Sequence, residues 1–554
     1  MSPRQLLKLA PGIAVLLFLP LSCNPVEKPG EDLESLPKAM ALYARVDGRD
    51  ATLSSVPDVP VEGAQISIEF SREVNLEEPA GEYTFSGPEL SVAYGKDRSI
   101  VEFSTAAALD PFTAYTLEIP AGRHFGVNVV EPVTVKFRTA YDKSEKFPRI
   151  EDEELLTLVQ RQTFKYFWDY AHPVSGLARE RLGSGETVTS GGSGFGIMTF
   201  PVAVERGFVS RKEAADRLRT IVDFLQNKAA RFHGAFPHWL NGTTGAVIPF
   251  SANDNGGDLV ETAFLIQGLL TVEMYFDRPE EADIREAIET IWKDVEWDWY
   301  TRGFWNNELY WHWSPDREWA MNMTITGWNE AMIVFFLAAA SPTHPISAEV
   351  YRSGWARNGG IRNGRSFYGV KLPLGSDYGG PMFFAHYSFL GLDPHIKDQY
   401  ASYWEQNCAH TRINQLYCSY NPGKHAGYSG VCWGLTASDI PGGYAASSPT
   451  NDKGVIAPTA ALASMPYLPD WSMAALRTFY YVYGDRLWGE YGFHDAFCLD
   501  SGWFASSYIA IDQGPIAIMI ENYRTGLLWN CFMKHPIVEE AFAILGIWRD
   551  NRTD

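Results

Sequence analysis

The sequence predicts a mainly α-helical protein that is preceded by a small all-β domain. Between about residues 39 and 140, apolar and polar residues alternate in short runs, which is typical of strands. From 151 to 548, apolar residues recur at helical spacing, and long loops rich in glycine and aromatic residues separate the helices. Such loops do not fit a simple helical bundle, so we expect an (α/α)6 toroid in which inner and outer helices alternate.

Composition narrows the range of partners. The chain has 554 residues and a formal net charge of −21, which argues against a nucleic acid or an anionic membrane surface as partner. Aromatic residues make up 14% of the chain. So many rings indicate either platforms for neutral polar ligands such as sugars or a large aromatic core, and composition alone leaves both open.

The N-terminus has the pattern of an export signal. Arg4 and Lys8 precede an apolar stretch from Leu9 to Leu21, which is too short to span a bilayer comfortably. The following Ser22-Cys23 is similar to a bacterial lipoprotein processing site. We therefore expect a signal peptide at 1–22, a lipid on Cys23 and a flexible tether at 23–38, with a plainly cleaved signal as the alternative. This predicts a protein of the bacterial cell envelope that touches the outer membrane only through its lipid.

Residues 39–140 are expected to form the all-β domain. Its predicted strands are Gln65–Phe70, Leu90–Ala93, Ser99–Phe103, Tyr115–Ile119 and Val133–Phe137. The phrases IEFSREVN, ALDPFTAYTLEIP and VTVKFRTA resemble bacterial Ig-like domains, and this resemblance implies a β-sandwich. Because no catalytic groups cluster here, we interpret the domain as a spacer or docking module. The charged segment 141–150 is predicted to be a linker.

Helical periodicity begins after this linker. The predicted helices are Glu153–Tyr170, Arg211–Gln226, Leu259–Tyr275, Pro279–Ile291, Trp328–Ala340, Ile396–Cys408, Val455–Met465, Trp471–Tyr483, Pro515–Tyr523 and Ile537–Leu545. The glycine-rich run Gly191–Gly196 is expected to be a loop that lines a pocket.

The chain lacks the sequence patterns of several enzyme classes. It contains no CxxC, HExxH or GxSxG motif, so we expect no metal, no other cofactor and no serine-hydrolase triad. His172, His238, His386 and His425 lie in aromatic contexts, where a hydrogen-bonded scaffold role is the more common one.

Acidic residues in apolar sequence are the best candidates for chemistry, because burial raises the pKa of a carboxyl group. Glu330 stands at the start of a very apolar helix, where complementing the helix dipole is the alternative role. Asp258 and Glu261 have the spacing of a capping box. Asp512 and Glu521 are flanked by isoleucines, and a cap or a buried ion pair would also explain them.

Seven segments together resemble the glucoamylase-like domain of glycoside hydrolase family 144, the β-1,2-glucanases. They are FWDYAHPVSGLARER (167–181), GGSGFGIM (191–198), FPHWLNGTTG (236–245), NDNGGDLVETAF (253–264), GWNEAM (327–332), YGVKLPLGSDYGGPMFFAHYSFLGLDP (368–394) and SSYIAIDQGPIAIMIENYRTGLLW (506–529). The resemblance covers roughly residues 150–548. It implies an (α/α)6 barrel that hydrolyses β-1,2-linked glucan with inversion and releases sophorose or short sophorooligosaccharides.

The resemblance also implies roles for individual residues. Glu330 is the expected general acid, and Asp512 is our choice for the base side, with Asp500 and Glu521 as rivals. The base of some relatives acts through a water or a substrate hydroxyl. The expected sugar contacts are Asp254, Asp258, Glu261, Trp239, Trp328, Tyr378, His386, Trp433, Gln513 and Glu521.

Other functions remain open at this point. A non-catalytic glycan-binding lipoprotein of an uptake system would share the aromatic residues, but it needs no carboxyl group at the start of an apolar helix. A β-1,2-glucan transglycosylase would keep the same fold. A lyase that acts on acidic polysaccharides would need a positive pocket, which the acidic balance of the chain disfavours.

Overall fold

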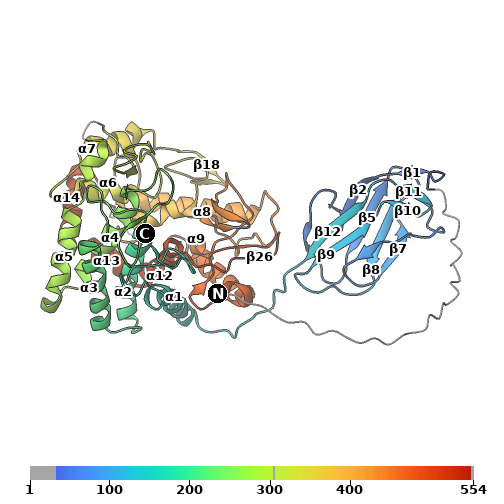
Figure 1. Cartoon of the computed structure of the whole chain (residues 1–554), viewed down its shortest axis with the longest axis horizontal. Coiled ribbons are helices and arrows are strands. Elements are labelled where there is room, and N and C mark those ends of the chain that lie inside the picture. Colours follow the sequence, from blue (N-terminus) through green and yellow to red (C-terminus); the bar gives the residue numbers. More distant parts are fainter. Residues whose placement is uncertain (1–32, 304–305, 551–554) are drawn as a thin grey trace, which may run out of the picture. The chain divides into compact units, whose positions relative to one another are not determined.

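The computed structural model describes residues 33–303 and 306–550, so the predicted signal peptide, the lipidation site Cys23 and most of the tether lie outside the described residues. The chain divides into two compact units (Figure 1). The first comprises Met1–Ser54, Gly63–Ala107 and Tyr115–Lys136, and the second comprises Ser55–Glu62, Ala108–Ala114 and Phe137–Asp554.

The first unit is built from strands. Its five-stranded antiparallel sheet has the order β3-β2-β5-β8-β7, formed by Arg49–Asp50, Ala41–Val46, Gln65–Phe70, Ile100–Thr105 and Leu90–Tyr94. A smaller sheet joins β1 (Lys38–Ala39), β11 (Val127–Val129) and β10 (Gly122–His124), and β6 (Thr84–Phe85) pairs with β9 (Ala114–Ile119). In β5, Ile66, Ile68 and Phe70 are buried while the residues between them are not, which is the alternation that predicted this strand.

The second unit is mainly helical. Its α-helices are α1 (Asp152–Trp168), α2 (Ser190–Glu205), α3 (Arg211–Asn227), α4 (Leu259–Tyr275), α5 (Ala282–Lys293), α6 (Met332–Ala339), α7 (Ala348–Val350), α8 (Tyr403–Tyr420), α9 (Pro458–Leu462), α10 (Pro469–Arg477), α11 (Gly484–Leu487), α12 (Ala510–Thr525), α13 (Leu527–Phe532) and α14 (Ile537–Leu545). The unit also contains β4 (Val56–Val59), whose partner is the end of β12 (Val133–Thr139).

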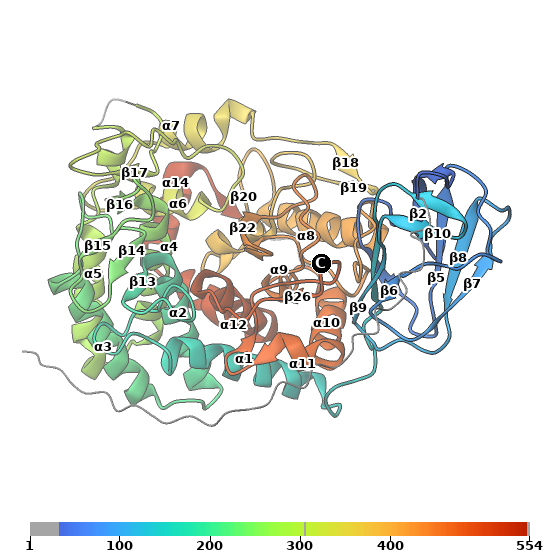
Figure 2. The same cartoon turned by 45° about the vertical axis from the view of Figure 1, so that its right-hand side comes forward.

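Helices α2, α4 and α12 form the interior of this unit. Almost all of their residues are buried, whereas α3 and α5 bury only one face and lie at the edge of the unit in Figures 1 and 2. Helix α3 begins with a complete capping box between Ser210 and Glu213. A helix that is buried on all sides has no polar face, which explains why these inner helices lack a clear amphipathic period.

We predicted that the glycine-rich run 191–196 is a loop. The structure shows that it lies within α2. Its glycines allow α2 to approach α4 closely. A Cβ atom on Gly194 would stand 2.3 Å from the carbonyl oxygen of Phe264, and one on Gly268 would stand 2.2 Å from the carbonyl oxygen of Gly194. Tertiary packing therefore overrides the low helix propensity of glycine here.

Further boundaries also differ from the prediction. Helix α6 begins at Met332 rather than Trp328, and α8 begins at Tyr403, because Ile396–Lys397 form strand β20 with Trp548–Arg549 (β27). Segment 141–150 packs within the second unit, where Tyr141 is buried and its hydroxyl donates to Asp485 at 2.6 Å.

Short sheets occupy the loops between the helices. The order β13-β14-β15 joins Thr187–Thr189, Trp239–Asn241 and Val247–Ile248, while β16 (Gly257–Asp258) pairs with β17 (His312–Trp313). A hairpin is formed by β21 (Ala437–Ile440) and β22 (Gly443–Ala446). The remaining pairs are β18 (Ser366–Phe367) with β19 (Val370–Lys371), β23 (Trp488–Gly489) with β24 (Gly492–Phe493), and β25 (Phe497–Cys498) with β26 (Trp503–Phe504).

Two further properties concern the described residues only. None of their helices combines the length and the apolar character that crossing a bilayer requires. Their cysteines, Cys408, Cys418, Cys432, Cys498 and Cys531, are all free thiols.

Candidate active site

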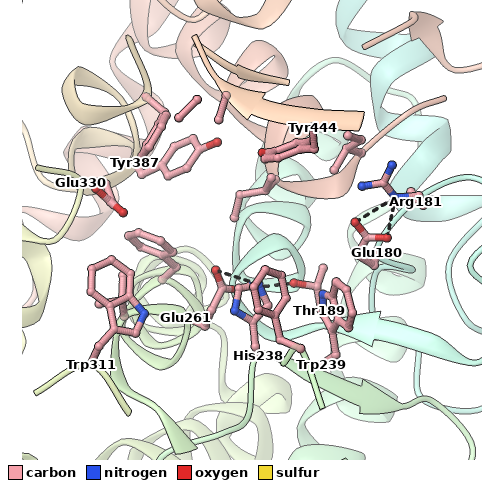
Figure 3. A pocket seen from close by; sticks show the side chains of 18 residues that line it. Glu180, Arg181, Thr189, His238, Trp239, Glu261, Trp311, Glu330, Tyr387 and Tyr444 are labelled. Atoms are coloured by element: carbon pink, nitrogen blue, oxygen red, sulfur yellow. Dashed lines mark hydrogen bonds and ion pairs between the residues drawn. The ribbon is translucent and has the colours of Figure 1, made fainter. Parts of the chain in front are cut away.

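The second unit contains a cavity of about 400 Å³, which is within the usual range for a small-molecule site. Figure 3 shows the side chains that line it. They come from loops and helix starts far apart in the sequence: Glu180, Arg181, Thr189, His238, Trp239, Phe250, Val260, Glu261, Phe264, Trp311, Glu330, Phe383, Tyr387, Ala437, Tyr444, Ala446, Ile509 and Ile511.

The first turn of α4 supplies one acidic wall. Asp258 caps the helix, because its Oδ1 accepts the backbone N–H groups of Val260 and Glu261 at 3.0 and 2.9 Å. Glu261 does not close a capping box. Its Oε2 instead accepts the backbone N–H of Gly191 at 2.8 Å and the hydroxyl of Thr189 at 3.4 Å. Asp258 is thus the N-cap of α4, whereas Glu261 takes no part in the cap and lines the cavity.

His238 is a residue that sequence reasoning underrated. Its Nδ1 lies 3.1 Å from Asp258 and 3.9 Å from Asp254, and its Nε2 lies 3.9 Å from Glu261. Burial by itself lowers the pKa of His238, but these three carboxyl groups outweigh it and raise the pKa to about 9. His238 is therefore an imidazolium at neutral pH and supplies positive charge to this wall.

Asp254 lies behind that wall and does not belong to the cavity lining. Only 4% of its surface is exposed, and burial together with Asp258 raises its pKa to about 7, against the opposing effect of His238. Asp254 thus supports the charge pattern of the wall, and the expected direct contact with a sugar is not available from this position.

Glu330 lines the cavity two residues before α6. Its backbone carbonyl accepts the hydroxyl of Ser388, and its side chain projects into the hollow in Figure 3. Burial raises its pKa to about 7, and the negative charges of Glu261 and Asp258 add to the effect. Glu330 therefore holds a proton through much of the neutral range.

The end of the cavity opposite Glu330 contains an ion pair that the sequence did not reveal. Arg181 Nε lies 2.9 Å from Glu180 Oε2, and Nη1 lies 3.0 Å from Asp439 Oδ1. Glu180 and Arg181 end the motif at 167–181, but the sequence assigned neither of them a role in the site. They give the cavity a second carboxylate across from Glu330, at the end shown on the right of Figure 3.

Asp512 is buried behind Tyr387 and does not itself line the cavity. Tyr387 lines it, and the Tyr387 hydroxyl donates to Asp512 Oδ1 at 3.3 Å. Burial and the neighbouring Asp495 raise the pKa of Asp512 well above its usual range. Asp512 is the third residue of α12. It is therefore not the N-cap of this helix, the alternative role that its sequence context left open. It therefore reaches the cavity only through a hydroxyl group.

Aromatic rings line much of the cavity, but not all of those we expected. Trp239 does so, together with Phe250, Trp311 and Tyr444. Trp328, Tyr378 and Trp433 are not among the lining residues. Trp328 packs on Phe389 and Tyr403, Tyr378 packs on Phe367, and Trp433 is fully buried with its indole N–H bonded to Trp471. Trp328 and Trp433 are buried in the core, where large rings are commonly found, whereas Tyr378 is half-buried against a smaller apolar cluster.

Three other predicted sugar contacts also lie away from the cavity. His386 Nε2 pairs with the hydroxyl of Ser464 at 2.9 Å, and Gln513 donates to the carbonyl of Phe493 at 2.9 Å. Glu521 forms a two-pronged ion pair with Arg206 at 2.6 and 2.8 Å. The rival base Asp500 bonds His425 at 2.6 Å and is not a lining residue either. These groups are scaffold residues in the structure, which is the alternative that their sequence contexts left open.

Two clusters have the composition of a metal site. In the cavity wall, His238, Asp254 and Asp258 bring ligand atoms within 4.8 Å of one another, and Glu273, Glu289 and His535 do so elsewhere. Both oxygens of Asp258 already accept hydrogen bonds, including one from the indole N–H of Trp311 at 3.2 Å. The wall is therefore balanced by an imidazolium, and its donors do not require a metal ion.

A hollow with a proton-bearing carboxyl group, opposed carboxyl groups and aromatic walls has the groups that acid–base cleavage of a glycosidic bond requires, as in the class of glycoside hydrolases. Comparison with known proteins agrees. Residues 322–536 match a family model named Glycoamylase and described as "Putative glucoamylase". The chain is 45% identical over 457 residues to the exo β-1,2-glucooligosaccharide sophorohydrolase (non-reducing end) of Parabacteroides distasonis. That match includes 78% of this chain and spans 63% of the length of that curated relative.

Two solved structures are similar over most of their length. The endo-β-1,2-glucanase of Chitinophaga pinensis, in complex with sophorotriose and glucose, is 50% identical with a TM-score of 0.70 and covers 72% of this chain and 99% of its own. The β-1,2-glucanase of Parabacteroides distasonis is 39% identical with a TM-score of 0.70 and covers 91% of this chain and 74% of its own. The chain belongs to the glucoamylase-like β-1,2-glucanase family, the glycoside hydrolase family 144 type.

Proposed function

We propose that this protein hydrolyses β-1,2-linked glucan or its oligosaccharides with inversion at the anomeric carbon and releases sophorose or short sophorooligosaccharides. The observation that carries the proposal is Glu330, a carboxyl group with a pKa of about 7 that lines a cavity opposite other carboxylates. The substrate class rests on the named activities of the relatives, a sophorohydrolase and two β-1,2-glucanases.

In this mechanism Glu330 donates its proton to the glycosidic oxygen as the bond to the anomeric carbon breaks. Water attacks the same carbon from the opposite face and loses a proton to the base side, so that one proton leaves Glu330 and one is taken up. Asp512 is the proposed base, acting through the hydroxyl of Tyr387, since the carboxyl group itself does not reach the cavity. This agrees with the relay that the family resemblance implies.

The cavity walls hold the sugar in position. Trp239, Trp311 and Tyr444 offer ring faces, and His238 with Glu261 offers charged hydrogen-bond partners for hydroxyl groups. A protein that only binds glycans gains nothing from an acid whose pKa is raised to neutrality, which is why we favour hydrolysis over capture.

The function is tested with purified protein and linear β-1,2-glucan, using β-1,3- and β-1,4-glucans as matched controls. We expect new reducing ends from the β-1,2-linked polymer only, and proton NMR of the first product should show the α-anomer. Absence of reducing ends would support a binding protein, and a β-anomer as first product would overturn inversion.

We further propose the finer architecture that the sequence predicted. Helices that expose one face alternate along the chain with helices that are mostly buried. In each of the pairs α1 and α2, α3 and α4, α5 and α6, and α10 and α12, the first helix exposes one face and the second is mostly buried. This alternation supports an (α/α)6 toroid. The antiparallel sheets of the first unit support an Ig-like sandwich.

We also propose that the protein is exported and anchored to the outer membrane through a lipid on Cys23. The support is the sequence of residues 1–23 alone. The expected result is that the wild-type protein partitions with membranes after expression in a bacterial host, whereas Cys23→Ser is released into the soluble fraction. Equal partitioning of the two proteins would contradict the anchor.

A further inference from the structure

Two buried carboxyl groups, Asp495 and Asp512, face each other beneath the cavity. Each has one oxygen with an ordinary donor: Asp495 Oδ2 accepts the backbone N–H of Asp439 at 2.6 Å, and Asp512 Oδ1 accepts the hydroxyl of Tyr387 at 3.3 Å. The other two oxygens, Asp495 Oδ1 and Asp512 Oδ2, are buried and receive no hydrogen bond from a donor in the described residues. The two side chains interact directly, and each keeps one buried oxygen that has no donor in the part of the chain that the structure describes.

Such a contact requires a proton between the two carboxyl groups. Ionised carboxylates accept hydrogen bonds but cannot donate them, and like charges at this distance do not both persist in a buried site. The pKa directions agree, because burial and the neighbouring carboxyl group raise the pKa of Asp512, and burial raises the pKa of Asp495 to about 7. The pair therefore holds one proton when it carries a single negative charge.

The pair is connected to both ends of the cavity. Asp439 in β21 bonds Arg181 at 3.0 Å and accepts the hydroxyl of Ser507 at 2.5 Å, which links Asp495 to the wall that contains Glu180. Tyr387 links Asp512 to the wall that contains Glu330. The titratable groups around the pair are thus Asp439, Arg181, Tyr387 and Tyr444.

We propose that Asp495 is a positioning residue for the base side of the reaction, and that it shares one proton with Asp512 beneath the Tyr387 hydroxyl. This rests on the proposed function. As water attacks, its proton passes to the Tyr387 oxygen, the Tyr387 proton passes to Asp512, and the shared proton moves fully onto Asp495. The singly charged pair becomes neutral while Glu330 becomes negative, so charge and protons balance.

The shared proton is tested without substrate by infrared spectroscopy at pH 9, where Glu330 is ionised. The wild-type protein should show a protonated-carboxyl band that shifts in D₂O. Asp495→Asn should shift this band, because Asp512 stays buried and protonated but no longer shares its proton with a second carboxyl group. Glu281→Gln, which changes a buried carboxyl group paired with Arg211 and outside the cavity lining, is the matched control and should keep the band.

Kinetics test the positioning role. Asp495→Asn should lower kcat about 10-fold or more with KM within about twofold, and Tyr387→Phe should lower kcat while keeping the band. Absence of the band in wild type, or an unshifted band in Asp495→Asn, overturns the shared proton, and unchanged kcat in Asp495→Asn overturns the positioning role. The wild-type band is decisive even if the variant does not fold. A wild-type protein that shows the band but cleaves no β-1,2-glucan refutes the proposed function and, with it, the positioning role, while the shared proton stands.

Discussion

At the scale of single residues, Glu330 differs from the other carboxyl groups of the cavity in its partners. Glu180 is paired with Arg181, and Glu261 lies 3.9 Å from the imidazolium of His238. Among the described residues, no cation lies within 4.0 Å of the Glu330 carboxyl group. No cation therefore offsets its burial, and the difference in environment assigns it the role of proton donor.

The first prediction concerns pH. Because the pKa of Glu330 is raised to about 7, the donor loses its proton as pH rises through that value, and kcat/KM should fall along an alkaline limb near pH 7. Asp254 titrates in the same range, so Asp254→Asn is the control and should keep the limb. A profile that stays flat to pH 9 would contradict this prediction.

The second prediction concerns stability. The folded-state pKa of Glu330 exceeds its unfolded value of 4.5, so the native state holds more protons and loses stability as pH rises from 4.5 to 7. Glu330→Gln removes this cost and should raise the free energy of unfolding at pH 8 by about 1–3 kcal/mol, with little change at pH 4. Urea denaturation at both pH values measures it, and an equal effect at both would contradict the assignment.

At the scale of elements, α2 shows why part of the fold was not predictable. Four glycines within its first seven residues read as a loop by propensity. The reason for them is the contact with α4, α12 and Phe167, which lies in the tertiary structure. Helices such as α3 and α14, whose exposed faces leave a clear period, were predicted almost to the residue.

The third prediction follows from this contact. Gly194→Ala would place a methyl group 2.3 Å from the Phe264 carbonyl oxygen, so α2 and α4 must separate, at a cost of about 1–3 kcal/mol. Thermal unfolding should show a lower Tm. Gly443→Ala is the control, because its added methyl group meets nothing within 4 Å and its backbone is unstrained. Equal Tm values for the two variants would contradict the role of close packing.

Only part of the candidate site was predictable, because some of its residues come together only in the tertiary structure. Glu330, Glu261 and Trp239 belong to motifs and line the cavity. Glu180 and Arg181 end the motif at 167–181, but neither they nor Tyr444 were assigned a role, since a loop and a hairpin bring them to the cavity from distant parts of the chain. Trp433 and Glu521 have side chains suited to sugar binding but are buried away from the cavity. The Trp433 indole N–H donates to the carbonyl of Trp471, and Glu521 forms an ion pair with Arg206.

At the scale of the whole molecule, the net charge of the chain does not describe the charge of the cavity. The net charge of −21 is large, yet the cavity combines carboxylates with Arg181 and the His238 imidazolium. A neutral glucan gains no long-range attraction from this charge, whereas an anionic polysaccharide would be repelled.

The fourth prediction is therefore one of salt dependence. The kcat/KM on neutral β-1,2-glucan oligosaccharides should change by less than about twofold between roughly 20 and 500 mM NaCl, because screening acts on charged partners. Initial rates at constant pH measure it. A change of about tenfold would indicate that charge guides the substrate to the cavity, contrary to this account.

The most direct measurement of the central claim compares Glu330→Gln with the wild-type protein on β-1,2-linked glucooligosaccharides. Because the amide has the shape of the acid but no proton to donate, turnover should fall about 10²–10⁴-fold while the variant remains folded. Release of reducing ends at a near wild-type rate by Glu330→Gln would show that another group protonates the glycosidic oxygen and would contradict the account.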